Sequence, residues 1–283
     1  MLRASRTRLP ASLVAGAALL LALALVALLL SPLVRDDAYR VDLERILRAP
    51  DWSHPLGTDG LGRDVAARVL CGARVSLAVG LMAAGLSLLV GLPLGVIAGY
   101  QGGVADRIVS RCVEAVLCVP SLVVALALLA AEPPWLKRLP DALRIALVLG
   151  ITGWTPVTRY LRAEFLRLGE SDLVVSARAS GARGLRIVAL HLMPSSLAPV
   201  LVTAAFTVGA AILLEAALSF IGLGVPPPTP TWGGLLNEAR QHVARGWWLA
   251  LFPGLALFLA VLGCNLLGEG LRDLLDPRRG KHT

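Results

Sequence analysis

Long apolar runs separated by polar loops dominate the chain. Most of these runs are long enough to cross the ~30 Å hydrocarbon core of a bilayer as a helix. The pattern predicts an all-α, polytopic membrane helical bundle of about six transmembrane helices. The predicted spans are residues 11–34, Val75–Ala98, Val116–Ala131, Leu143–Val157, Pro199–Leu218 and Trp247–Leu267. The third and fourth runs are short for a span, so their boundaries are the least well defined.

The first apolar run follows three arginines near the N-terminus. A secretory signal peptide has an apolar core of only ~7–15 residues. This run is longer, so we interpret it as a retained transmembrane helix. The predicted regions are an N-terminal region with the first transmembrane helix (1–34), a periplasmic loop (35–73), a transmembrane core (74–267) and a cytoplasmic tail (268–283).

The composition supports a membrane location. The chain is 56% hydrophobic and only 16% charged, whereas soluble domains contain about 25% charged residues. The net charge of +8 does not indicate a nucleic-acid partner, because the Lys and Arg residues lie between apolar runs and not on one soluble face. By the positive-inside rule, clusters at Arg3–Arg8 and Arg159–Arg186 place both termini in the cytoplasm.

The sequence contains no motif for catalysis, metal binding or ATP binding. Its cysteines (Cys71, Cys112, Cys118 and Cys264) show no CxxC or Cys/His spacing. It has no GxxxxGK[ST] motif, so it cannot hold ATP phosphates by itself, and no HExxH or GxSxG set. We therefore expect a transport protein that is not an enzyme and carries no cofactor, with any ATP bound by a partner subunit.

The loop from Glu170 to Pro194 is the most informative polar segment. Val174, Ala177 and Gly181 recur at helical spacing, and Gly184 follows soon after. This pattern predicts two short helices that meet at a glycine turn. From the residues alone, the segment is equally compatible with a basic loop that lies on lipid headgroups.

The same loop resembles the EAA loop of ABC importer permeases, in which E-A-A is followed by three residues, Gly, nine residues and I-x-L-P. In that family the loop forms a coupling helix that sits in a cleft of the ATPase subunit. The resemblance implies an ATPase-coupling loop that contains Ser176, Ala177, Gly181, Arg183, His191 and Pro194. Val175 stands where the family usually has Glu, a difference that concerns one polar contact and not the docking role.

Six further stretches occur in the order typical of the C-type permease subunit of dipeptide, oligopeptide and nickel importers. They are HPLGTDGLGRDVAARVLCGARVSLAVG (54–80), GYQGG (99–103), PSL (120–122), LSFIGLGVPPPTPTWG (218–233), WWLALFPGLAL (247–257) and NLLGEGLRDLLDPR (265–278). The resemblance implies a type I ABC importer permease in the bacterial inner membrane. Its implied partners are a sister permease, two ATP-binding subunits and a periplasmic or lipid-anchored solute-binding protein. A dipeptide, an oligopeptide, glutathione and a nickel chelate remain possible solutes.

Glu215 lies inside the fifth apolar run. An acid at that depth is costly unless it faces the bundle interior or a wet cavity. It therefore lies on the translocation path, where it would meet a peptide amino group, or in an interhelical hydrogen bond, or in a snorkelling position near the interface. The proline-rich segment 226–230 is flanked by Trp232, Trp247 and Trp248, which we interpret as interfacial anchors.

A secondary transporter is the alternative class of membrane protein. Such a transporter is expected to show repeated halves and charged residues at mid-depth in the membrane. We find neither feature in the sequence, which favours the ATP-driven importer.

Overall fold

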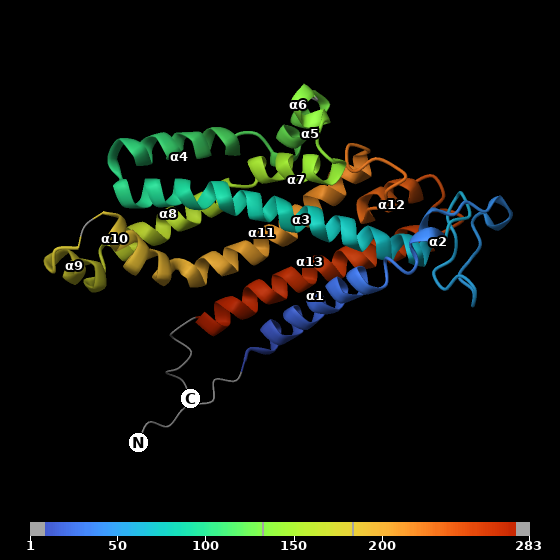
Figure 1. Ribbon diagram of the computed structural model, residues 1–283, viewed down its shortest axis with the longest axis horizontal. Helices are drawn as coiled ribbons and strands as arrows, with labels where there is room; N and C mark the ends of the chain where they lie inside the picture. Colours follow the sequence, from blue (N-terminus) through green and yellow to red (C-terminus); the bar gives the residue numbers. More distant parts are fainter. Residues whose placement is uncertain (1–8, 132, 183, 276–283) are drawn as a thin grey trace, which may run out of the picture.

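The computed structural model describes residues 9–131, 133–182 and 184–275, and the regular elements of these residues are helical. Figure 1 shows an elongated bundle with α9 and α10 at one end, termed the α9 end, and α2 and α12 at the other, termed the α12 end. The α-helices are α1 (Ala11–Leu29), α2 (Arg35–Tyr39), α3 (Val65–Val96), α4 (Gly103–Leu117), α5 (Ser121–Ala131), α6 (Pro134–Lys137), α7 (Asp141–Thr152), α8 (Thr155–Gly169), α9 (Asp172–Ala179), α10 (Leu185–Ile187), α11 (Met193–Ile221), α12 (Trp232–Ala239) and α13 (Trp248–Leu275). Two π-helical turns, Ile97–Gln101 and Val188–Leu192, extend α3 and join α10 to α11.

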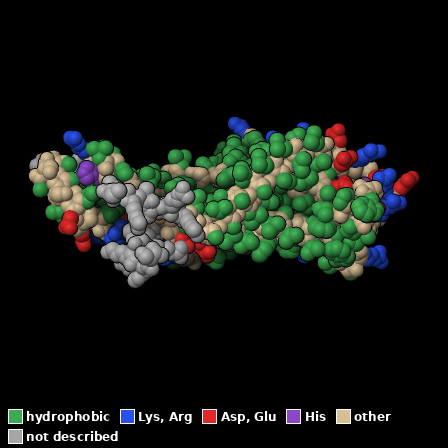
Figure 2. Space-filling model, turned by 90° about the horizontal axis from the view of Figure 1, so that it is seen from below, with side chains coloured by type: hydrophobic (Ala, Val, Ile, Leu, Met, Phe, Trp, Pro, Cys, Tyr) green, Lys and Arg blue, Asp and Glu red, His purple; other side chains and the backbone are tan. Residues whose placement is uncertain are grey.

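Four helical segments of the described chain are long and apolar enough to cross a membrane. They are Ala11–Leu29, Val65–Gln101, Leu185–Ile221 and Trp248–Leu275. A fifth span exists only if α4 and α5 are taken together across a bend of 82°. The all-helical membrane bundle is confirmed, with four or five candidate spans among the described residues where the sequence predicted about six. Figure 2 shows apolar side chains over the middle of the molecule and most charged side chains towards its two ends.

Both of the short predicted spans are interrupted. The run Val116–Ala131 breaks between α4 and α5 at Pro120, because proline lacks an N–H and disfavours helix at the preceding residue. The run Leu143–Val157 breaks between α7 and α8 at Gly153. The 12 residues of α7 give a length of about 18 Å at a rise of 1.5 Å per residue. One continuous helix in each run was therefore a wrong prediction.

Helices extend into both the predicted periplasmic loop and the predicted tail. Helix α3 begins at Val65, so the end of the predicted periplasmic loop 35–73 belongs to this helix. Asp64 caps it, because its Oδ1 accepts a hydrogen bond from the Ala67 N–H at 2.8 Å. At the other end, α13 continues to Leu275, so the first part of the predicted tail 268–283 is also helical.

Glycines on α3 allow α8 to pack closely against it. A Cβ added at Gly91 would lie 2.7 Å from Val157 Cβ, and one added at Gly95 would lie 2.8 Å from Leu161 Cβ. The Thr158 hydroxyl donates to the Gly91 carbonyl at 3.0 Å. Small residues and interhelical hydrogen bonds are what hold membrane helices together. Helix α8 is therefore fixed along the half of α3 nearer the α9 end.

Helix α1 runs antiparallel to α13. A Cβ added at Gly270 would collide with the backbone of Leu13, and one added at Gly263 would lie 2.9 Å from the Leu20 side chain. The start of α1 therefore meets the end of α13. In Figure 1 both of these helix ends point towards the α9 end of the bundle.

Candidate functional site

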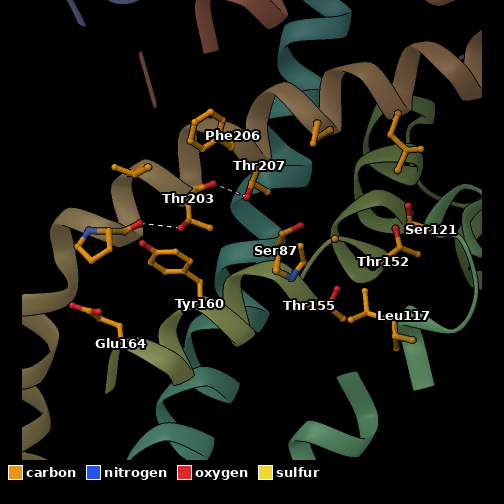
Figure 3. A pocket seen from close by; sticks show the side chains of 18 of the residues that line it. Ser87, Leu117, Ser121, Thr152, Thr155, Tyr160, Glu164, Thr203, Phe206 and Thr207 are labelled. Carbon is orange, nitrogen blue, oxygen red and sulfur yellow. Dashed lines mark hydrogen bonds between the residues drawn. The ribbon is translucent and has the colours of Figure 1, made fainter. Parts of the chain in front are cut away.

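A groove of about 1050 Å³ lies along one side of the bundle. Its walls come from the end of α7, from α8 and from α11, and the break between α4 and α5 forms one edge. Figure 3 shows hydroxyl side chains from these separate elements arranged around the groove. The hydroxyl-bearing lining residues are Ser87, Ser121, Thr152, Thr155, Tyr160, Ser195, Thr203 and Thr207.

Several of these hydroxyls donate their proton within their own helix. Thr152 Oγ1 donates to the Val148 carbonyl at 3.0 Å, and Thr207 Oγ1 donates to the Thr203 carbonyl at 2.8 Å. Each oxygen keeps lone pairs that can accept a further hydrogen bond. This part of the wall is therefore polar and uncharged, and it can accept hydrogen bonds from a passing solute.

The charged residues of the groove lining lie towards its α9 end. They are Glu164 and Arg167 of α8 and Arg272 of α13. Arg167 Nη2 lies 2.6 Å from Glu164 Oε1, and this hydrogen bond raises the pKa of Arg167 above its ordinary value. A solute that moved along the groove would meet uncharged side chains, apolar or hydroxyl-bearing, along most of its length and charged groups only at one mouth.

Glu215 lies beside the groove and is fully buried. Its neighbour Leu214 lines the groove, but Glu215 does not. Its Oε2 accepts a hydrogen bond from Ser76 of α3 at 3.0 Å, and its Oε1 accepts one from Ser219 at 2.7 Å. This is the location expected for an interhelical hydrogen bond. A role of Glu215 on the solute path stays a prediction.

The predicted coupling loop forms a helix–turn–helix at the α9 end. Helix α9 ends at Ala179, and the turn contains Gly181 with a φ of 86° and Gly184 with a φ of 54°. These left-handed values favour glycine, which has no Cβ. Helix α10 then leads into α11. The expected pair of short helices joined by a glycine turn is confirmed.

The residues expected to contact an ATPase are distributed along this segment. They are Ser176 and Ala177 on α9, Gly181 in the turn, His191 in the π-helical turn and Pro194 in the first turn of α11. Arg183 lies outside the described residues. The role of all six towards a partner stays a prediction.

Helix α9 has one buried apolar face, with exposed apolar side chains on either side of it. Val174 is buried and packs with Phe165 of α8 and Ile187 of α10. In contrast, Leu173 and Val175 are 51% and 54% exposed. The buried face fixes α9 to the ends of α8 and α11. Exposed apolar side chains next to one another in the chain are typical of a segment that contacts another molecule.

A buried ion-pair network at the α12 end was not predicted from the sequence. The Arg68 side chain donates to Asp59 Oδ2 at 2.6 Å and to Glu238 Oε1 at 2.9 Å. Arg63 donates to the same two carboxylates at 2.7 and 3.0 Å. The network joins the loop before α3, α3 itself and α12. The acids and arginines of HPLGTDGLGRD were a local signal, but Glu238 lies 170 positions from Arg68 and no spacing links them.

Two of the three predicted interfacial tryptophans are buried instead. Trp232 is fully buried, and its indole N–H donates to the Val69 carbonyl at 3.1 Å. Trp248 is 4% exposed, and its indole N–H donates to the Thr58 carbonyl at 3.1 Å. The anchor interpretation is therefore wrong for both residues. Trp247 is 56% exposed and remains compatible with it.

Comparison with known proteins places these features in context. Residues 91–281 match the family described as binding-protein-dependent transport system inner membrane component. The dipeptide transport system permease protein DppC of Alkalihalophilus pseudofirmus is 40% identical over 249 residues, which cover 88% of this chain and 80% of that protein. The glutathione transport system permease protein GsiD of Pectobacterium atrosepticum is 37% identical over 260 residues, covering 92% and 84%.

The fold is also similar to a solved structure. An inward-facing conformation of the MetNI methionine ABC transporter matches with a TM-score of 0.61 and 18% sequence identity. The match covers 73% of this chain and 96% of that chain. At this level of identity the likeness concerns the arrangement of the helices.

Proposed function

The chain belongs to the binding-protein-dependent transport system inner membrane components, and from this premise we propose that its groove forms half of a translocation pathway for short peptides. It is a multi-pass permease subunit of the inner membrane, in an ABC importer that a binding protein serves. ATP is hydrolysed by partner ATP-binding subunits. The solute crosses the membrane without covalent chemistry.

The observation that carries this proposal is the neutral groove wall. Peptides contain many amide N–H donors, and the oxygens of Thr152 and Thr207 retain lone pairs to accept them. Because the groove is open along one side of the chain, a second wall has to come from another subunit. A related sister permease is the partner that we infer for that role.

The segment α9–α10 is the site that we propose for contact with an ATP-binding subunit. Its exposed apolar residues Leu173 and Val175 project from a helix that is fixed to α8. Two ATP-binding subunits would then act on the two permeases. Closure of these subunits on ATP would switch the cavity between inward-open and outward-open states. The switch occurs because the closed ATP-binding subunits bind one state of the permeases more tightly than the other.

This arrangement sets the orientation in the membrane. We propose that the α9 end is cytoplasmic and that the α12 end faces the periplasmic or lipid-anchored binding protein. The contact of Leu13 with Gly270 supports two cytoplasmic termini, because it brings the start of α1 to the end of α13. The arginine clusters of the sequence favour the same orientation.

Short peptides are the solute class that we propose. One relative is named as a dipeptide permease and another as a glutathione permease, and glutathione is itself a small peptide. A dipeptide or oligopeptide fits the neutral, hydrogen-bond-accepting wall. A glutathione or nickel-chelate importer of the same family is the alternative.

The test is uptake of labelled dipeptides into proteoliposomes that contain the two permeases, the ATP-binding subunits and the binding protein. We expect uptake that requires ATP, and we expect Thr207→Trp to lower it at least about tenfold by filling the groove (an estimate of about 1.4 kcal/mol in the barrier). Leu213→Trp is the matched control, because Leu213 is on the same helix, is 53% exposed and does not line the groove.

Two results would contradict the proposal. Uptake driven by an ion gradient without the ATP-binding subunits would indicate a secondary transporter. Equal uptake by both tryptophan variants would show that the groove is not the pathway.

A further inference from the structure

A second cavity, of about 600 Å³, lies between α4 and α8. On α8 it is lined by Thr158, Arg159 and Arg162, whereas the groove is lined by Tyr160 and Glu164. The two cavities therefore use different faces of the same helix. The other wall, from α4, carries apolar residues and the hydroxyl of Ser110, and it includes Val109, Val113 and Leu117.

This cavity contains a cation that no described residue neutralises. Arg162 is neutralised by Asp106, which accepts from its Nε and, at 2.7 Å, from its Nη2. Glu114 lines the cavity but is paired with Arg111 at 2.8 Å. Among the described residues, Arg159 makes neither a hydrogen bond nor an ion pair. The cavity therefore presents one exposed arginine without a counter-charge, whereas the Ser110 hydroxyl donates to Asp106 Oδ1 at 3.1 Å.

The depth of the cavity matches that of a membrane interface. The Thr158 carbonyl would lie 3.1 Å from a Cβ added at Gly95, and Arg162 Cα would lie 3.1 Å from one added at Gly99. These glycines lie at the end of the long apolar run of α3, where the hydrocarbon core gives way to headgroups. Arg159 thus lies near the end of that apolar run, towards the α9 end of the bundle.

We propose that this cavity binds the phosphate of an anionic phospholipid, with Arg159 as the headgroup contact and the apolar α4 wall as the contact for an acyl chain. Basic pockets between membrane helices on the cytoplasmic side are known to hold anionic headgroups. The inference rests on the proposed function only for the assignment of the α9 end to the cytoplasmic leaflet. A zwitterionic lipid should bind more weakly than an anionic one, because it would bring its own cation to a site that already has an excess positive charge.

The test measures lipid retained by the purified full-length chain, in detergent, by native mass spectrometry. Phosphatidylglycerol and phosphatidylethanolamine are titrated separately against the wild type, Arg159→Gln and Arg159→Lys. We expect one tightly held phosphatidylglycerol on the wild type, retention that is about fivefold weaker for Arg159→Gln, and partial rescue by Arg159→Lys, since one basic residue near an anionic surface contributes about that factor. Arg107→Gln is the matched control, because Arg107 is an exposed arginine of α4, the other helix of the cavity, and does not line the cavity.

Each remaining outcome would overturn the assignment. Equal retention by the wild type and Arg159→Gln would show that Arg159 does not hold the headgroup. An equal loss in Arg107→Gln would indicate a diffuse surface charge instead of a site. Displacement of the lipid by inorganic phosphate alone would point to a soluble anion as the ligand. Because lipid retention is measured without transport, a failure here leaves the permease proposal intact, and a failure of uptake leaves this one intact.

Discussion

Glu215→Gln keeps the shape of the side chain but replaces one acceptor oxygen by a donor. In the native structure each carboxylate oxygen accepts one hydroxyl, from Ser76 at 3.0 Å and from Ser219 at 2.7 Å. Hydrogen bonds between membrane helices contribute about 0.6 kcal/mol on average and at most about 1.7 kcal/mol. We therefore expect the Gln variant to lower the free energy of unfolding by about 1 kcal/mol.

Glu215→Leu should cost more, because it removes both acceptors. The side chains of Ser76 and Ser219 are buried, so their hydroxyls would have no water to bond. A buried unsatisfied donor costs about 1–3 kcal/mol, and a serine can recover part of this by turning to its own helix carbonyl. The expected loss is about 2–4 kcal/mol. A double-mutant cycle with Ser76→Ala should give a coupling energy of about 1 kcal/mol.

The assay is unfolding in mixed detergent micelles, combined with uptake per folded molecule in proteoliposomes. If Glu215 is structural, free-amine and N-acylated dipeptides should be affected equally by the Gln variant, and uptake per folded molecule should equal that of the wild type. A selective loss of free-amine peptides with unchanged stability would refute this reasoning. That result would place the Glu215 carboxylate on the solute path.

Three further predictions address the coupling segment, the topology and the helix seam. Gly181→Asp should lower uptake several-fold while ATP hydrolysis and membrane abundance persist, because a side chain is strained at a φ of 86°. Normal uptake would contradict the assignment of this turn to the ATPase contact. A reporter fused after Thr283 should be active only in the cytoplasm, and periplasmic activity would overturn the proposed orientation. Gly95→Leu should lower the free energy of unfolding by about 1–3 kcal/mol through overpacking against α8, whereas Gly85→Leu, in open space, should change it much less in the same assay.

The sequence predicted the helical bundle because burial in lipid demands long apolar runs, and such runs are local. It failed where a run was interrupted by two or three residues. Pro120 and Gly153 each stand inside an apolar window, so hydropathy averaged over that window hides the break. The opposite error occurred at the start of α3. Asp64 caps this helix, so α3 begins before the apolar run, in a segment whose polarity suggested a loop.

The candidate site was only partly predictable for a related reason. The glycine turn at Gly181 is a local feature, and the sequence located it. The groove is assembled from residues such as Ser87, Thr152 and Thr203, which lie on three helices and share no spacing. Single serines and threonines in apolar helices carry no individual signal. Their common location becomes visible only when the helices are packed.

The two walls of the groove, α8 and α11, are joined at the α9 end, and this contact limits how the pathway can open. Phe165 of α8, Val174 of α9 and Leu192 before α11 belong to one buried cluster. A displacement of α9 by a partner should therefore move α8 and α11 together, with little change in the groove between them. Alternating access would then come from motion of the whole chain against its sister permease.

Cysteines placed at Phe165 and Leu192 in a cysteine-free background, joined by oxidation, should leave ATP-driven uptake close to that of the reduced protein. Loss of uptake on oxidation, with recovery on reduction, would show instead that α8 and α11 must separate during transport.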